Sequence, residues 1–283
     1  MKIYIPTYNR ADIPLAGTLK GWPKDYPVHV VVRKTQIEPY ERLLERLGLE
    51  GASILPIGED GIANTRNAIL RHAGDSKFAM IDDDLGMLIR RSDHDWKLRG
   101  PTHAEFIVMM KEMEKYLDDV AHVAISCREG NNRILEDHVE NNRGIRLVAY
   151  RGDVLRWKNL RYDTSLEGRE DLDMTLRLME KGYKNIVLYK YAQGQKGSNT
   201  TGGLNGSDAR KDEAMERTAK LLQEKHKGFV RARTKMTKTA WGGGVRWDVT
   251  CYWKRAFASS QRAKEKEYEA ISDKQIKNIT DND

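Results

Sequence analysis

Cysteine and long apolar runs are both scarce in this chain of 283 residues. The only two cysteines, Cys127 and Cys251, are too few for a disulfide framework or a cysteine-rich zinc site. Apolar runs reach only strand length, as in Val28–Val32, whereas a membrane helix needs about 18 apolar residues. The N-terminus enters a strand pattern directly at Met1–Pro6, without the features of a secretory leader. We therefore expect a protein that has no membrane partner and works in the cytoplasm.

Acidic residues are nearly absent from one C-terminal segment. The whole chain has 49 Lys plus Arg against 42 Asp plus Glu, a formal charge of +7. Between Lys225 and Arg262 lie ten basic residues and a single acid, Asp248. The remainder is close to neutral, so the excess charge belongs to this segment. Such a concentration points to an anionic partner more strongly than the same charge spread evenly.

Apolar runs of strand length alternate with helical patterns through the first 190 or so residues. This alternation is typical of an α/β fold with a doubly wound, mainly parallel sheet. In such sheets ligands bind at the carboxyl ends of the strands. Strands are expected at 3–5, 28–32, 53–57, 78–81, 122–126, 145–150 and 186–189, and helices at 39–49, 62–72, 102–117 and 172–181.

A polar stretch rich in Gly, Ser, Thr and Asn follows at Gln193–Ser207 and predicts a loop, either a lid over a ligand or a plain linker. It lacks the Gly-x-x-x-x-Gly-Lys-[Ser/Thr] pattern, so it is not a P-loop. Residues 210–227 read as a charged helix, and the tail beyond Arg262 is polar. We therefore divide the chain into an α/β domain at 1–207 and a basic, largely helical extension at 208–283.

Three consecutive carboxylates, Asp82, Asp83 and Asp84, follow the apolar strand that ends at Ile81. Adjacent carboxylates repel one another unless a cation neutralises them. Alternate residues of an extended segment point to the same side, so Asp82 and Asp84 can converge on one cation. A Mg²⁺ or Mn²⁺ ion that bridges a diphosphate needs few protein carboxylates. The alternative is a solvated acidic turn that caps the next helix.

A second acidic group, at Gly168–Asp173, opens the expected helix at 172–181. Acids at a helix start are often only caps, favoured by the helix dipole. In a catalytic role, Glu170 or Asp171 would deprotonate an acceptor hydroxyl as it attacks an activated carbon. Both interpretations stay open at this point.

Polar residues also follow the first expected strand and lie on the helix at 62–72. In the loop Pro6-Thr7-Tyr8-Asn9-Arg10, Tyr8 could stack on a base while Thr7 and Arg10 reach polar ligand groups. Asn64 and Arg66 share the helix, and Arg66 could either neutralise a phosphate or pair with an acid.

Four segments together resemble a known family. Ile3–Arg10, Gly61–Asn67, Ile81–Asp84 and the pair Glu170-Asp171 look like motifs of GT-A-fold glycosyltransferases of the family-2 type, in the same order and at similar intervals over residues 1–190. More narrowly, the acidic motif, the Gly-Arg-Glu-Asp segment and the Gly-rich loop resemble the TET-associated glycosyltransferases of bacteriophages. Those enzymes are thought to glycosylate hydroxymethylated pyrimidines in DNA.

The resemblance implies a UDP-sugar donor, a Mn²⁺ or Mg²⁺ ion on its diphosphate and, for a phage-encoded chain, the host cytoplasm as its location. It implies that Asp82 and Asp84 form an Asp-x-Asp metal motif and that Asp171 or Glu170 is the catalytic base. Many relatives add a late histidine to the metal site, and His226 is the only histidine after His138. Its charged setting, Glu224-Lys225-His226-Lys227, is more typical of a solvated helix end. The remaining donor contacts are expected at Pro6, Thr7, Tyr8, Arg10, Asn64, Arg66 and Asp83.

Aromatic residues are interleaved with the cations of the basic segment. Lys and Arg neutralise phosphates, and aromatic rings stack on exposed bases. Enzymes that modify bases commonly extrude the target base from the duplex. The alternative is that the tryptophans are core residues of a helical unit. The expected nucleic-acid contacts are Arg231, Arg233, Lys235, Lys238, Trp241, Arg246 and Trp247.

The preferred hypothesis is a metal-dependent glycosyltransferase that acts on 5-hydroxymethylcytosine or a related hydroxymethylated pyrimidine in phage DNA. A second hypothesis keeps the enzyme and makes the acceptor a polysaccharide or a protein. A third is a non-catalytic DNA-binding protein whose aspartates are structural. The sequence does not specify the sugar, the stereochemical course or the number of subunits.

Overall fold

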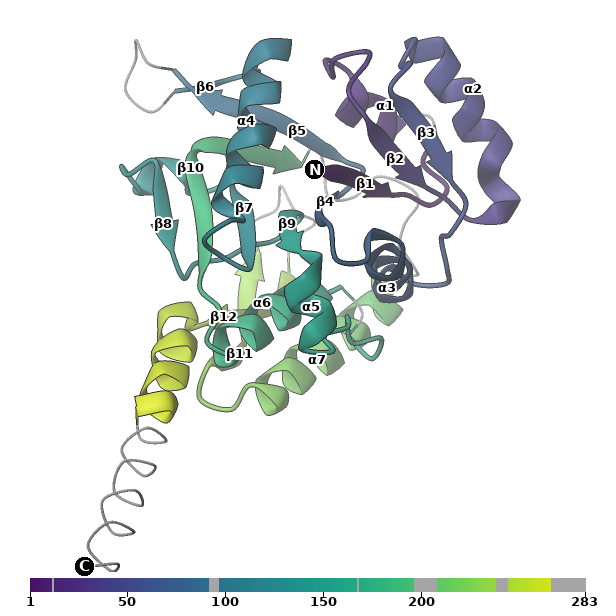
Figure 1. Ribbon diagram of the computed structural model, residues 1–283. Coiled ribbons are helices and arrows are strands. Elements are labelled where there is room, and N and C mark those ends of the chain that lie inside the picture. Colours follow the sequence, from purple (N-terminus) through teal and green to yellow (C-terminus); the bar gives the residue numbers. More distant parts are fainter. Residues whose placement is uncertain (12, 92–96, 167, 196–207, 238–243, 266–283) are drawn as a thin grey trace, which may run out of the picture.

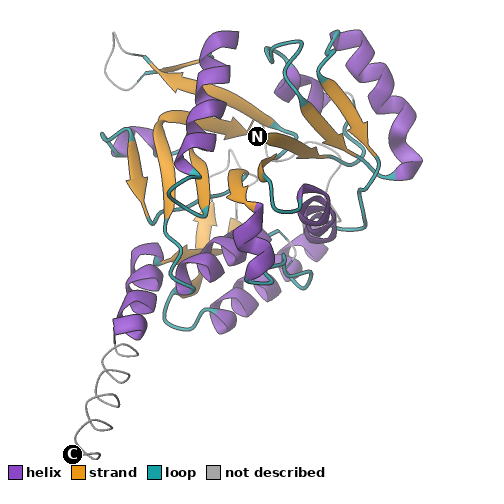
Figure 2. Ribbon diagram, in the orientation of Figure 1, coloured by secondary structure: helices purple, strands orange, loops and turns teal. Residues whose placement is uncertain are grey.

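The computed structural model describes residues 1–11, 13–91, 97–166, 168–195, 208–237 and 244–265. One large mixed sheet forms its centre, with helices on both faces and a small hairpin beside it (Figures 1 and 2). The strands of the large sheet are β1 (Lys2–Pro6), β2 (Val28–Val31), β3 (Ala52–Leu55), β4 (Lys77–Ile81), β5 (Leu85–Arg90), β6 (Leu98–Arg99), β7 (His122–Cys127), β8 (His138–Glu140), β9 (Leu147–Arg151) and β10 (Asn185–Gln195).

The order of the strands is β3-β2-β1-β4-β9-β7-β10-β5-β6, and β8 pairs with β10. The first four strands are parallel to one another, as are β7 and β10. The other strand pairs in the sheet, which involve β9, β5, β6 and β8, are antiparallel. The expected α/β fold with parallel strands in its first half is confirmed, and the carboxyl ends of β1 and β4 meet at one edge.

Helices cover both faces because successive side chains of the buried strands point to opposite sides. Ile3 and Ile5 of β1 join one apolar cluster, whereas Tyr4 joins the other. The first cluster packs under α1 (Ile13–Leu19), α2 (Ile37–Leu47) and α4 (His103–Tyr116), and the second under α3 (Ile62–Ala73), α5 (Gly152–Trp157) and α6 (Glu170–Glu180). Short 3-10 turns at Lys34–Gln36 (η1) and Asn131–Arg133 (η2) complete the connections.

The C-terminal extension packs on α6 through a third apolar cluster. It consists of α7 (Asp208–Lys225), the antiparallel hairpin β11 (Val230–Thr237) and β12 (Gly244–Cys251), and a helical segment at 253–265. Leu222, Val230 and Ala256 are buried against Leu172 and Leu176 of α6. The extension is largely helical as expected, but its most basic part forms the hairpin. The division at residue 207 stays a prediction, and the two parts share a core.

Several elements were not expected from the sequence: α5, the hairpin strands and the short strands β5, β6 and β8. The polar stretch that begins at Gln193 is partly strand, because β10 continues to Gln195 along β5. The rest of that stretch, 196–207, lies outside the described residues. Among the described residues, no helix is both long and apolar enough to cross a bilayer.

A histidine, His122, is buried in the centre of the sheet. It lies on β7 opposite Tyr150 of β9, is completely buried, and has no hydrogen-bond partner on either ring nitrogen among the described residues. Burial lowers its pKa from 6.5 to about 3. The unfolded chain therefore takes up a proton below pH 6.5 that the folded chain does not, and stability is lost as the pH falls.

We expect wild type to lose about 2 kcal/mol more stability than His122→Leu between pH 7.5 and pH 5, because each pKa unit corresponds to about 1.4 kcal/mol. Urea unfolding at three pH values measures the difference, and the variant supplies the control for all other titrating groups. Parallel stability curves for the two proteins would contradict the burial of a neutral imidazole.

Candidate active site

The three aspartates after β4 have different environments. Asp83 points into the protein, where its carboxylate accepts from the Thr7 hydroxyl at 2.6 Å and from the Arg10 guanidinium at 2.8 Å. Its backbone carbonyl accepts from the Thr18 hydroxyl at 2.7 Å. Asp83 therefore ties the loop after β1 to the end of β4, and the carboxylates on either side of it are left for other contacts.

Asp82 and Glu170 are joined by one buried arginine. The Arg66 guanidinium, on α3, donates to Asp82 at 2.7 Å and to Glu170 at 2.6 Å. Its flat face lies 5.5 Å from the centre of the Tyr162 ring. Charge-assisted pairs of this kind fix geometry, because a buried arginine left without a carboxylate would be very costly. The sequence suggested that Arg66 either neutralises a phosphate or pairs with an acid, and in the structure it pairs with two acids.

The environment of Asp82 disfavours its ionised form, mainly because the carboxylate is buried. Burial raises the pKa of Asp82 to about 6; Arg66 opposes the shift, and the charges of Asp171, Asp84 and Asp83 add to it. An acid cluster of this kind is one that an added cation would relieve.

Asp84 accepts two hydrogen bonds from the side-chain amide of Gln195, at 2.9 and 3.1 Å. The Arg10 guanidinium lies 3.5 Å from the same carboxylate. Gln195 is the last residue of β10, more than a hundred residues away in the chain. Sequence reasoning missed it because the surrounding polar stretch predicts a loop, and no local signal marks its pairing with Asp84.

The two acids at the start of α6, Glu170 and Asp171, differ in burial and in their hydrogen-bond partners. Glu170 is 4% exposed, burial raises its pKa to about 7, and its second carboxylate oxygen has no hydrogen-bond partner among the described residues. Asp171 is partly exposed and accepts only from the backbone N–H of Leu172, at 2.8 Å. Within the described part of the chain, Asp171 forms no ion pair.

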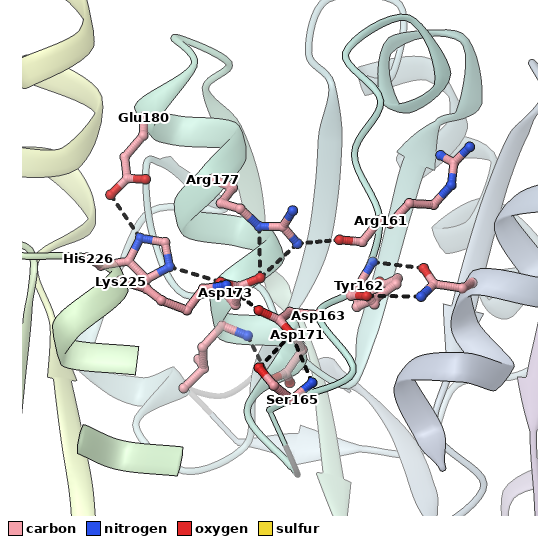
Figure 3. A network of polar contacts seen from close by, with 12 residues as sticks. Arg161, Tyr162, Asp163, Ser165, Asp171, Asp173, Arg177, Glu180, Lys225 and His226 are labelled. Atoms are coloured by element: carbon pink, nitrogen blue, oxygen red, sulfur yellow. Dashed lines mark hydrogen bonds and ion pairs between the residues drawn. The ribbon is translucent and has the colours of Figure 1, made fainter. Parts of the chain in front are cut away.

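His226 is not brought to the aspartates of β4. Its two ring nitrogens lie 2.9 Å from Glu180 and 3.1 Å from Asp173, both on α6 (Figure 3). Asp173 is fully buried and also accepts from Arg177. Burial would lower the pKa of His226, but the bonds to Asp173 and Glu180 raise it. As placed, His226 joins α7 to α6, and both ring nitrogens that could ligate a metal are engaged.

A cavity of about 730 Å³ lies above the carboxyl ends of β1 and β4. It is lined by Asp82, Asp83, Asp84, Glu170 and Asp171, and by Pro6, Thr7, Tyr8, Arg10 and Arg66 among the expected donor contacts. Asn64 does not line it; its side-chain amide donates to the carbonyl of Asp60 at 2.8 Å. Tyr8 is 37% exposed, and the Arg33 guanidinium stacks on its ring at 3.9 Å.

The hairpin closes the opposite side of this cavity. Arg246 and Trp247 of β12 line it, together with Trp253 of the helical segment at 253–265, and the Arg169 guanidinium donates to the backbone carbonyl of Trp247 at 2.9 Å. This bond links the residue that precedes the two α6 acids to strand β12. Two of the residues predicted to bind nucleic acid, Arg246 and Trp247, therefore lie beside the acidic site.

The outer face of the hairpin is basic. Arg231, Arg233 and Lys235 alternate along β11, are exposed, and lie opposite Thr250, Asp248 and Arg246 of β12. Within the described residues none of these three cations has an ion-pair partner. Lys238 and Trp241, which were also expected to contact nucleic acid, lie outside the described residues.

Among the described residues, no group of three or more His, Cys, Asp or Glu side chains is arranged to hold a metal ion. The metal role expected for Asp82 and Asp84 stays a prediction, in which two carboxylates bind a cation that completes its shell with other oxygens. That pattern fits Mg²⁺ and Mn²⁺, which bind through one or two carboxylates together with waters and substrate phosphates.

Comparison with known proteins places this site in a family. Two similar proteins are the Beta-glucosyl-HMC-alpha-glucosyl-transferases of enterobacteria phages T6 and T2, with 26% and 25% identity over 79% of this chain and 82% of each relative. Among solved structures, TarS of S. aureus in complex with UDP-GlcNAc aligns with a TM-score of 0.49 and 15% identity, over 77% of this chain and 65% of that one. Glucosyl-3-phosphoglycerate synthase of Mycobacterium tuberculosis aligns with a TM-score of 0.45 and 10% identity, over 87% and 85%.

The family model described as TET-Associated Glycosyltransferase matches residues 1–203, which include the whole acidic site and both faces of the sheet. This match agrees with the resemblance found in the four sequence motifs and favours an enzyme over a non-catalytic DNA-binding protein. The roles of the individual aspartates stay predictions. The chain belongs to the TET-associated glycosyltransferase family.

Proposed function

We propose that this glycosyltransferase moves a sugar from a UDP-sugar to a hydroxyl group on a hydroxymethylated pyrimidine in DNA. The observation that carries the proposal is the cavity itself, which is lined by the aspartates that follow β4, by Asp171 and by residues of the basic hairpin. Because the two relatives are phage proteins named for HMC, phage DNA in the host cytoplasm is the proposed setting.

The donor would occupy the half of the cavity next to β1 and β4. Thr7, Tyr8 and Arg10 lie at the carboxyl end of β1, where ligands of α/β sheets bind, and the partly exposed ring of Tyr8 offers a surface for a base. Asp82 and Asp84 would hold Mg²⁺ or Mn²⁺. When bound, such an ion supplies positive charge to the diphosphate leaving group.

Asp171 is the better base of the two α6 acids. Glu170 also lines the cavity, but it is 4% exposed and one of its carboxylate oxygens is held by Arg66. Asp171 lines the cavity and has no competing cation among the described residues. In the proposed step it removes the proton of the acceptor hydroxyl, the acceptor oxygen bonds to the anomeric carbon, and the bond from that carbon to the diphosphate breaks to release UDP.

A second acceptor deserves the same test. Both phage relatives are named for transfer to a β-glucosyl group on HMC rather than to HMC itself. This chain could likewise extend a sugar that the base already carries. The chemistry is unchanged, since a hydroxyl is the acceptor in both cases, and the two differ only in how much of the cavity the acceptor fills.

To test the function, the purified protein is incubated with Mn²⁺, a panel of UDP-sugars, and DNA that contains cytosine, 5-hydroxymethylcytosine or its β-glucosylated form. Mass spectrometry of the nucleosides should show one added sugar on a modified base and none on cytosine. Transfer to glycans or proteins, without any transfer to modified DNA, would replace the DNA acceptor by the alternative one.

Asp82→Asn together with Asp84→Asn should reduce transfer at least about a hundredfold, because a bound metal contributes several kcal/mol of charge stabilisation. The melting temperature should stay close to that of wild type, since Arg66 keeps its pair with Glu170. Asp118→Asn, a change of the same type at an exposed aspartate, is the control. Wild-type rates in the double variant would eliminate the metal assignment.

Asp171→Asn should lower kcat by about 10²–10⁴, the usual contribution of a general base, with UDP affinity retained. Calorimetric titration with UDP separates the two effects. If Asp171→Asn keeps its rate while Glu170→Gln loses it without losing stability, the base is Glu170 instead.

A further inference from the structure

Seven arginines line the cavity, and they fall into two groups. Arg10, Arg33 and Arg66 each pair with a carboxylate, at distances of 2.6 to 2.8 Å. The other four are Arg143, Arg146, Arg169 and Arg246; Arg246 belongs to β12, and Arg169 donates to the backbone of β12. The first group is thus occupied by carboxylates, whereas the second includes two arginines that lie in the hairpin or contact it.

The second group has few ion-pair partners, although the charges of Asp171 and Asp248 act on Arg169. Among the described residues, Arg143 and Arg246 form no ion pair, and Arg146 has only Glu129 at 3.8 Å. Arg169 is 8% exposed and donates to a backbone carbonyl rather than to a carboxylate. Guanidinium groups gathered in a cavity without matching carboxylates favour an anion, and phosphate matches their planar donors well.

Arg146 is held in place by a strained backbone. Its φ is +63°, and the N–H of Leu147 donates across it to the carbonyl of Ile145 at 2.7 Å. Its own carbonyl accepts from the N–H of Asp82 at 2.9 Å. One guanidinium nitrogen is buried without a hydrogen-bond partner among the described residues. A tight turn with positive φ is costly for a residue other than glycine, and such strain is concentrated at functional sites.

Arg246 lines the cavity and also belongs to the basic face of the hairpin. It lies directly opposite Lys235, and like charges at such a pair destabilise a hairpin unless an anion lies between or beside them. Arg233 and Arg231 continue the same face of β11. The cations thus run from inside the cavity onto an exposed surface, as a polynucleotide backbone entering the cavity would require.

On the basis of the proposed function, we infer that Arg143, Arg146, Arg169 and Arg246 form a subsite for a backbone phosphate next to the acceptor nucleotide. The enzyme would then recognise a modified base only within a polynucleotide and would use the free nucleoside poorly. The same arginines would bind the donor diphosphate if the donor reached this half of the cavity, so the test must separate the two phosphates.

The test compares wild type with R143Q/R246Q, because both arginines are exposed and their loss leaves the core intact. Fluorescence anisotropy gives the Kd for a labelled oligonucleotide that contains 5-hydroxymethylcytosine, without donor, and calorimetry gives the Kd for UDP. We expect oligonucleotide binding about tenfold weaker or more near 0.1 M salt, a salt dependence reduced by about one phosphate contact per arginine, and unchanged UDP affinity. Arg42→Gln, on the exposed face of α2, is the matched control.

Loss of UDP affinity with unchanged oligonucleotide affinity would overturn the inference and assign the arginines to the donor. Transfer supplies a further comparison: kcat/KM should fall for the oligonucleotide and not for 5-hydroxymethyl-2'-deoxycytidine, and an equal fall for both would also overturn it. If wild type transfers sugar to no modified DNA, the proposed function fails, but the two affinities still decide whether the phosphate subsite exists.

Discussion

Three segments that are remote in the sequence meet at one guanidinium, that of Arg66. Helix α3 carries the arginine, β4 delivers Asp82, and α6 begins at Glu170. Without the Arg66 guanidinium, the carboxylates of Asp82 and Glu170 would lie close together away from water. Their repulsion would destabilise the fold unless one of them took up a proton. The position of Asp171, one residue beyond Glu170, and that of Asp84, two residues beyond Asp82, both follow from this pair of bonds.

The cavity consequently has a rigid half and an open half. On the donor side, side chains are satisfied by one another, as Asp83 is by Thr7 and Arg10. On the hairpin side, Arg143 and Arg246 form no ion pair among the described residues, and the wall belongs to an extension that packs on α6. Under the proposed function, the preorganised groups would bind the small donor, and the guanidinium groups near the hairpin would attract the large anionic acceptor.

Local patterns were sufficient to predict the acidic centre of this site. The apolar strand before Asp82 and the acid-rich start of α6 are signals contained within a few residues. Gln195 and Arg146 could not be predicted, because a β10–β5 pairing and a strained turn bring them to the cavity, and neither leaves a local pattern. The hairpin was missed although one face of it is apolar, with Val230, Ala232 and Met236 of β11 opposite Cys251, Val249 and Val245 of β12. The alternation of these residues with cations was interpreted as a basic helical segment rather than as two strands. His226 was the one late histidine available, and its setting between Asp173 and Glu180 depends on helix packing.

The bond from Arg169 to the hairpin ends on a backbone carbonyl, not on the side chain of Trp247. A carbonyl is present whatever residue occupies that place, so the hydrogen bond that anchors β12 to the start of α6 does not depend on the side chain at position 247. A substitution there would keep this bond. Under the proposed function, such substitutions in β12 would change the groups offered to an acceptor and leave the groups beside β1 and β4 unchanged.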